Sequence, residues 1–351
     1  VEIDANKNKI IADIGELYYD YLVIATGSKT NYFGNKEIEH NSMAMKSIPQ
    51  SLNIRSLILE NFEQALLTNK VDERHSLMNF VIVGGGPTGV ELAGALAEMK
   101  KEILPKDYPD LDVRKMEINI VQSADRILNT MSENASNKAE KFLHNLGVSI
   151  WKNLRVTGYD GRIVSTNTNI TFEAATVIWT AGVQGSFPKG LIEDSIEKGI
   201  NRIKVDEFNK VKNYQNIFAI GDIAIMNVTE GIEPQPMLAQ PAMQQARNLA
   251  KNFVNILKNK PLIAFTYKDK GSMATIGRNK AVVDLPNYKF SGVFAWFVWM
   301  FVHLFSLIGF KNKAVVFLNW VYNYIRFDRE ARLIIRPYKK RQFTSFTSDE
   351  I

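Results

Sequence analysis

A glycine-rich stretch at residues 80–91, with the sequence Phe-Val-Ile-Val-Gly-Gly-Gly-Pro-Thr-Gly-Val-Glu, sets the local structure of this chain. Its four leading apolar residues predict a buried strand, and the alanine-rich residues 92–99 predict a helix. A strand that passes through GxGxxG into a helix is typical of a dinucleotide site, because the helix start presents free N–H groups and a positive dipole end to phosphates. The stretch therefore predicts an α/β fold with a nucleotide site at this turn.

The small residues of the turn have separate roles in such a site. Gly84 permits the tight turn, Gly86 lets the backbone approach a pyrophosphate, and Gly89 allows close packing of helix against strand. Pro87 and Thr88 stand at the helix start and are counted with the cofactor-binding residues. The alternative is a glycine-rich connection between a core strand and a helix that binds nothing.

Composition excludes several kinds of chemistry. The 351 residues include no cysteine, which excludes disulfides, thiolate metal sites and dithiol redox mechanisms. The four histidines are scattered without metal-ligand spacing, so no metal is expected. Of the net charge of +6, residues 311–341 alone carry +7, which leaves −1 for the rest of the chain. The basic charge belongs to the tail, so we expect no nucleic-acid partner. The length suggests about two domains.

Two further strands end in similar small-residue turns. The apolar run at residues 18–24 ends in Ala-Thr-Gly, and the run at residues 174–179 ends in Thr-Ala-Gly. This internal repeat suggests two similar nucleotide-binding halves in tandem. We assign the following turn residues to cofactor binding: Thr26, Gly27, Thr180, Ala181 and Gly182.

A fourth strand, at residues 217–220, is followed by Gly221 and Asp222. Ligands of doubly wound sheets lie at the carboxyl ends of strands. We therefore predict that Asp222 accepts a hydrogen bond from a ligand hydroxyl; the alternative is a capping carboxylate. Further on, a helix is expected to begin near Pro241. Gln240 and Gln244 are four residues apart and lie on one face of this helix. This spacing by itself would indicate a solvent-exposed face.

The strand predicted at residues 117–121 bears on nicotinamide selectivity. The position just past it, where an acid would bind the ribose 2′-hydroxyl, holds Gln122. A glutamine can form a hydrogen bond with the hydroxyl without repelling a 2′-phosphate. The site is therefore expected to discriminate less sharply between NADH and NADPH. Arg126 is either a phosphate partner or a solvated surface charge.

The last quarter of the chain changes character. Residues 292–310 include no Lys, Arg, Asp or Glu and carry Trp296 and Trp299, and basic residues follow. A helix of these nineteen residues would barely reach bilayer thickness. Aromatic density beside basic charge favours a helix at the membrane interface, drawn to anionic lipid by about 1 kcal/mol per basic residue. A transmembrane span and a protein–protein surface are the alternatives.

Taken together, the motifs resemble type II NADH dehydrogenase, a single-chain flavoprotein that oxidises NADH with a membrane quinone. The matching segments are Ala25–Ser28, Gly84–Glu91, Ile178–Val183, Phe218–Asp222, Ala239–Gln245 and the aromatic and basic tail. The resemblance implies two Rossmann-like dinucleotide-binding domains of three-layer ββα type and a C-terminal helical membrane-anchoring segment. Their expected bounds are 1–50 with 188–287 for FAD, 51–187 for NAD(P)H, and 288–351 for membrane association.

The resemblance also implies the chemistry. Hydride passes from NADH, with NADPH as a further donor, to FAD, and a quinone is then reduced without proton pumping. Asp222 holds the ribityl chain, with Gly221 and Ala242 beside the cofactor. Gln240 and Gln244 match glutamines that face flavin and quinone, which replaces the surface interpretation. Glu91 matches a carboxylate that assists nicotinamide stacking or proton delivery, the alternative being a helix first-turn acid. The catalytic set is therefore Glu91, Gln240 and Gln244.

Further expectations concern the form and place of the protein. The glycine motif that binds the FAD pyrophosphate is absent because the chain begins after it, so we expect an N-terminally truncated chain that binds FAD poorly. The resemblance implies a peripheral protein on the cytoplasmic face of the cell membrane and a homodimer formed through the C-terminal region. The alternatives are a soluble NAD(P)H-dependent flavin reductase with a protein acceptor, and a nucleotide-binding membrane protein without FAD.

Overall fold

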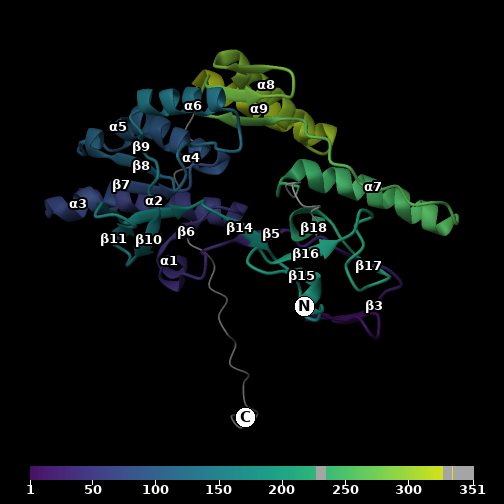
Figure 1. Cartoon of the computed structure of the whole chain (residues 1–351). Helices are drawn as coiled ribbons and strands as arrows, with labels where there is room; N and C mark the ends of the chain where they lie inside the picture. The colour runs from purple at the N-terminus through teal and green to yellow at the C-terminus, as the bar shows by residue number, and fades with distance from the viewer. Residues whose placement is uncertain (227–234, 327–333, 335–351) are drawn as a thin grey trace, which may run out of the picture.

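The structure, a computed structural model, describes residues 1–226, 235–326 and 334. In Figure 1 a parallel sheet and its helices occupy one side of the molecule, and a group of short strands with helix α7 occupies the other. Helices α8 and α9 lie along the top, beside α6. The expected Rossmann-type α/β architecture is confirmed.

The first half is built on a parallel sheet of five strands in the order β6-β13-β7-β8-β9. The strands are β6 (Met43–Ala44), β7 (Asn79–Val83), β8 (Glu117–Val121), β9 (Ser149–Trp151) and β13 (Thr176–Trp179). Strand β7 is buried along its whole length, since both faces of the sheet are covered. Val83 pairs with both Trp179 and Val121, so the turns that follow these strands meet at one edge.

Helices cover one face of this sheet and a small antiparallel sheet covers the other. The helical face packs Phe80 and Ile82 against α2 (Ile48–Leu67), α4 (Pro87–Glu98) and α6 (Glu133–Asn145). The opposite face packs Val81 and Val83 against β10 (Val156–Tyr159), β11 (Ile163–Thr166) and β12 (Thr171–Glu173). Shorter helices connect these layers: α1 (Lys36–Asn41), α3 (Val71–Leu77) and α5 (Leu104–Asp107).

Helix α2 begins three residues before the expected start at residue 51. Ser47 and Gln50 form a capping box, in which the Ser47 hydroxyl accepts from the Gln50 amide at 3.4 Å. This reciprocal pair satisfies donors that a helix start leaves open, so it fixes the boundary.

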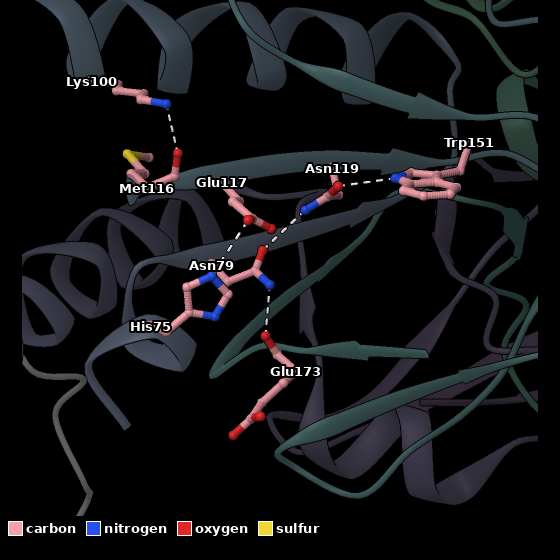
Figure 2. Close-up of polar contacts among 8 residues, drawn as sticks. All are labelled: His75, Asn79, Lys100, Met116, Glu117, Asn119, Trp151 and Glu173. Carbon is pink, nitrogen blue, oxygen red and sulfur yellow. Dashed lines mark hydrogen bonds and ion pairs between the residues drawn. The ribbon is translucent and has the colours of Figure 1, made fainter. Parts of the chain in front are cut away.

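A ladder of buried amides ties the strands of the parallel sheet to one another and to the small antiparallel sheet (Figure 2). The Asn79 amide donates to the carbonyl of Glu173 at 2.7 Å, and the Asn119 amide donates to Asn79 Oδ1 at 3.0 Å. Trp151 Nε1 donates in turn to Asn119 Oδ1 at 3.0 Å. Because each buried polar group finds a partner, the ladder sets the register of β7, β8 and β9 without leaving an orphaned donor.

The second half consists of short sheets. Strands β4 (Leu22–Ile24) and β17 (Ile217–Ala219) pair in parallel, and β15 (Ile196–Glu197), β16 (Arg202–Val205) and β18 (Ala224–Met226) form a second sheet. The expected N-terminal hairpin is part of a three-stranded sheet of β1 (Glu2–Asp4), β2 (Lys9–Ala12) and β3 (Gly15–Tyr18). Helix α7 (Ala239–Leu257) lies beside these strands.

The two repeated small-residue turns lead into strands that pair with each other. Strand β5 (Ser28–Thr30) follows the first turn and β14 (Val183–Gly185) follows the second, and they form an antiparallel pair. This pair joins the two halves, so the internal repeat of the sequence corresponds to the connection between them.

The C-terminal unit begins with an antiparallel sheet of β19 (Ser272–Thr275), β20 (Ala281–Asp284) and β21 (Lys289–Ser291). The apolar run at residues 292–310 is divided between α8 (Val293–Ser306) and α9 (Phe310–Arg326), with Gly309 at φ 84° between them. Helix α8 buries Ala295 beside Ala281 and Val283. Among the residues that the structure describes, no helix combines the length and the apolar character that crossing a membrane requires.

Candidate functional site

A cleft of about 690 Å³ opens at the carboxyl edge of the parallel sheet, where β7, β8 and β13 end together. The predicted residues that line it are Gly84, Gly86, Gln122, Thr180 and Ala181. Residues from three chain segments, which span about a hundred positions of the sequence, thus meet in one site. The cause is the parallel pairing of β7 with β13 and with β8.

Of the three glycines to which the sequence assigns a role in the turn, two are packed against other parts of the chain and one faces open space. A Cβ on Gly84, which has φ +110°, would lie 2.7 Å from Ala181 Cα, and one on Gly89 would lie 2.0 Å from the Gly84 carbonyl oxygen. No heavy atom of the described residues lies within 4 Å of the Cβ position of Gly86. The first two therefore bring strand and helix together, and the third leaves room for a ligand at the helix start.

The other predicted residues of this turn region differ in position. Thr180 Oγ1 lies 3.0 Å from the carbonyl oxygens of both Val83 and Gly84, and this contact ties β13 to the turn. Pro87 and Thr88 are exposed at the start of α4. Gly182 is packed against the Phe33 ring and does not line the cleft.

Gln122 supports the turn as well as lining the cleft. It is buried, and its Oε1 accepts from the Gly85 amide at 2.9 Å. The Arg126 guanidinium, which is partly exposed, donates to the carbonyls of Met131 and Asn129 at 2.8 Å each. Arg126 therefore holds the loop that follows β8.

The cleft has a second wall that the motifs do not predict. It is formed by Tyr32, Phe33 and Asn35 after β5, and by Leu154, Arg155 and Thr157 after β9. The pairing of β9 beside β8 would have placed the residues after β9 at this cleft, since residues that follow adjacent parallel strands reach the same edge of the sheet. The exposed Arg155 side chain makes no hydrogen bond or ion pair with any residue in the described part of the chain.

Around Asp222 the second half presents a separate set of polar groups. Asp222 Oδ2 accepts from the Ser28 hydroxyl at 2.6 Å and lies 3.4 Å from Lys46 Nζ. Ser28 directly follows Thr26 and Gly27, so the first small-residue turn and the Gly-Asp turn are held together. Gly221, at φ +76°, lies against Ala242 of α7, whose side chain is 3.2 Å from the Cβ position of Gly221.

The glutamines of α7 have different environments. Gln244 pairs with the main chain of Lys268, donating to its carbonyl at 3.0 Å and accepting from its amide at 3.1 Å. Gln240 is partly buried at the helix start. Gln245, which the sequence analysis missed, is fully buried, and its Oε1 accepts from the Gly221 amide at 2.7 Å. Its Nε2 is buried without a hydrogen-bond partner among the described residues.

Glu91 lies on α4, one and a half turns past Gly86. Its Oε1 accepts from the Thr275 amide of β19 at 3.3 Å. Burial raises the pKa of the Glu91 carboxyl, and the Thr275 bond and the charge of His303 oppose that shift only in part. Glu91 lines a second pocket, of about 390 Å³, between α4 and the C-terminal helices.

Comparison with known proteins agrees with this arrangement. A family described as pyridine nucleotide-disulphide oxidoreductase matches residues 1–246, and one described as the NDH2 C-terminal domain matches residues 270–329. The chain is 34% identical over 326 residues to the type II NADH:quinone oxidoreductase Ndh of Mycobacterium tuberculosis, covering 88% of this chain and 67% of that protein.

A plant relative and a solved structure extend the comparison. The mitochondrial internal alternative NAD(P)H-ubiquinone oxidoreductase A1 of Arabidopsis thaliana is 30% identical, over 88% of this chain and 64% of that protein. The structure of NDH2 from Plasmodium falciparum in complex with NADH superposes with a TM-score of 0.86 at 23% identity, covering 95% of this chain and 84% of that one. The chain thus spans about two thirds of the length of these curated relatives.

Proposed function

The chain belongs to the family of type II NADH:quinone oxidoreductases, and on that basis we propose how its residues carry out NADH oxidation by a quinone. The family is flavin-dependent, and its cofactors are FAD and NADH. The observation that carries the proposal is the meeting of Gly84, Gly86 and Gln122 in one cleft at the start of α4. Electron transfer to quinone is expected to be the activity, with NADH consumed only when a quinone is supplied.

In this proposal the dinucleotide occupies the 690 Å³ cleft. The free N–H groups at the start of α4 face its pyrophosphate, and Gly86 offers no side chain in the way. Thr180 and Ala181 close the cleft from β13. We assign residues 51–187 to the NAD(P)H domain on this ground.

The residues around Asp222 fit the flavin. Gln245 Nε2 is a buried donor without a hydrogen-bond partner among the described residues, and no described side chain caps the start of α7, so its first N–H groups are open there. Such donors suit the electron-rich edge of a flavin, and the Asp222 carboxylate suits a ribityl hydroxyl. When bound, FAD accepts hydride from NADH and passes the electrons to the quinone. We assign residues 1–50 and 188–287 to the FAD domain, with Gln240 and Ala242 beside the cofactor.

The C-terminal segment, residues 288–351, is proposed to hold the protein at a membrane surface. Support comes from large apolar side chains that stay exposed on α8 and at the start of α9: Phe294, Phe297, Phe301, Phe305, Ile308 and Phe310. A quinone dissolved in lipid must be reached from that surface. Co-sedimentation with anionic lipid vesicles tests this, and protein left in the supernatant would contradict it. Attachment to the cytoplasmic face and a homodimer remain predictions, the latter for light scattering to test.

The cleft is also proposed to accept NADPH. Gln122 brings no negative charge to the ribose position, and the Arg155 guanidinium lines the cleft without a partner among the described residues. An arginine near that position accommodates a 2′-phosphate in dinucleotide folds. A relative that acts on NAD(P)H supports this use of the site.

Replacing Arg155 by alanine should therefore lower kcat/KM for NADPH by about tenfold, because one phosphate–arginine contact is lost. The value for NADH should change by less than about twofold, since NADH lacks that phosphate. Binding of 2′,5′-ADP compared with 5′-AMP gives the same information without turnover. Arg126→Ala is the matched control, because that guanidinium is bound to loop carbonyls. An R155A protein with an unchanged kcat/KM for NADPH would contradict the assignment.

A further inference from the structure

Phe33 has a backbone conformation that residues of its type rarely adopt. Its φ is 52°, in the left-handed region, where a bulky side chain is an outlier. In the described part of the chain, every other non-glycine residue in that region is an asparagine, except Leu128. Leu128 is fully buried, so core packing accounts for it, whereas Phe33 is 68% exposed. Burial therefore does not explain why a phenylalanine occupies this position.

The turn that holds Phe33 is fastened to the end of β13. Asn31 is buried, its amide donates to the Gly182 carbonyl at 3.0 Å, and its carbonyl accepts from Trp179 Nε1 at 2.9 Å. The Asn31 side chain then fixes the next residues, because its Oδ1 accepts from the Phe33 amide at 2.8 Å. These bonds use only the main chain of Phe33, so the turn itself does not require the aromatic ring.

The Phe33 ring lies on the wall of the 690 Å³ dinucleotide cleft, against the Thr-Ala-Gly turn. Its Cζ is 2.8 Å from the position that a Cβ on Gly182 would take. The Trp179 ring meets it at an angle of 62°, with the ring centroids 6.4 Å apart. A side chain at Gly182 would displace the ring, so this glycine and the left-handed turn together place a flat apolar group in the cleft.

The order of the strands indicates which half of a dinucleotide meets Phe33. Strands β13 and β8 flank β7 on opposite sides. The pyrophosphate is proposed to lie at the start of α4, directly after β7, and the adenosine ribose at Gln122, directly after β8. The other half, which is nicotinamide and its ribose, must then extend across the end of β13, where the Phe33 ring lies.

The same stretch of chain connects Phe33 with the residues proposed to hold the flavin. Ser28, whose hydroxyl donates to Asp222 Oδ2 at 2.6 Å, precedes Phe33 by five positions. Five residues reach at most about 18 Å, so the ring stays on the side of the cleft nearest Asp222. The nicotinamide must approach the flavin to transfer hydride, and this is therefore the end of the cleft where it is expected.

We propose that Phe33 is a binding residue for the nicotinamide half of NADH, with its ring packed against the nicotinamide and its ribose. The inference rests on the proposed function. A flat apolar ring gains contact area with such a ligand and removes water from the part of NADH that reacts. An asparagine or a glycine would adopt the left-handed conformation more readily, so the phenylalanine serves the ligand rather than the turn.

The test replaces Phe33 by asparagine in the flavin-loaded, full-length protein. Isothermal titration measures the Kd of tetrahydro-NADH, which transfers no hydride, and the Kd of 5′-AMP, which lacks the nicotinamide half. F33N should raise the Kd of tetrahydro-NADH about tenfold, because the ring contact is lost, and should change that of 5′-AMP by less than about twofold. Phe33→Tyr keeps the ring and is the matched control, so both Kd values should stay within about twofold.

The thermal midpoint separates loss of binding from loss of folding. Asparagine favours the left-handed region, so F33N should unfold at the same temperature as the unmodified protein or at a higher one. An F33N protein that binds tetrahydro-NADH normally, or that loses both affinities together with a lower midpoint, would overturn the assignment of Phe33 and leave the proposed function standing. If the unmodified protein binds no tetrahydro-NADH, the proposed function itself fails.

Discussion

Replacing Glu91 by glutamine is expected to lower the rate of quinone reduction by about a hundredfold, which corresponds to about 2.7 kcal/mol of barrier. The amide keeps the size and the bond from Thr275 but has no proton to give to a quinol oxygen. Flavin reduction by NADH should continue, because the cleft at Gly84 and Gly86 is unchanged. Steady-state assays with a soluble quinone measure the overall reaction, and rapid mixing with NADH measures flavin reduction alone, so together they separate the two half-reactions.

The pH dependence gives the same prediction a second readout. Burial raises the pKa of Glu91, so its protonated form persists to higher pH, and activity should fall as pH rises through that raised value. E91Q should lose this limb of the profile. Glu102→Gln is the matched control, since it removes one charge just beyond α4 from a residue paired with Lys101. Equal quinone turnover in E91Q, or an unchanged alkaline limb, would remove Glu91 from the mechanism.

Two alanine substitutions at the glycine turn should separate ligand binding from folding. A Cβ on Gly86 meets no atom in the part of the chain that the structure describes, and it projects into the space proposed for the pyrophosphate. We expect G86A to raise the NADH Kd at least about tenfold while the free energy of unfolding falls by no more than about 1 kcal/mol. Isothermal titration and urea denaturation give the two numbers.

Gly89→Ala should destabilise the fold first and lose NADH binding only as a consequence. Its Cβ would lie 2.0 Å from the Gly84 carbonyl oxygen, so α4 must move away from β7. The expected loss of unfolding free energy is about 3 kcal/mol or more, with NADH binding lost as a consequence. A stable G89A protein with normal NADH affinity would show that the turn is not built as described. A G86A protein with normal affinity would place the dinucleotide elsewhere.

Residues at the ends of strands could be selected from the sequence as site candidates, because parallel strands bring distant turns to one edge of a sheet. The turn at Gly84, the Thr-Ala pair at 180–181 and Gln122 all line one cleft. Arg155 was not predicted, because it lies in the connection between β9 and β10, which has no periodic sequence pattern. Its place is set only by the pairing of β9 beside β8.

The glutamines of α7 show why helix spacing alone is ambiguous. The same interval of four that pairs Gln240 with Gln244 also pairs Pro241 with Gln245. The latter set, with Leu249 and Asn252, forms the buried face of α7. Only the packing of α7 against the turn at Gly221 decides which face is buried.

The second pocket, which Glu91 lines, also depends on packing that the sequence pattern does not determine. The apolar run at residues 292–310 predicted one interfacial helix, and Gly309 instead separates α8 from α9. Trp299 and Trp320 then face each other, and α4 supplies the opposite wall. Glu91 was predicted from its motif, but its neighbours come from a segment about 180 positions away.

The proposed electron path is tested most directly by sequential rapid mixing of the full-length, flavin-loaded protein in the absence of oxygen. NADH is added first and a water-soluble quinone second, while the visible absorbance of the flavin is followed. We predict that the absorbance falls on the first mixing and returns on the second, with one quinone reduced for each NADH oxidised. Flavin that stays reduced after quinone is added, and recovers only with a protein acceptor, would contradict the assignment.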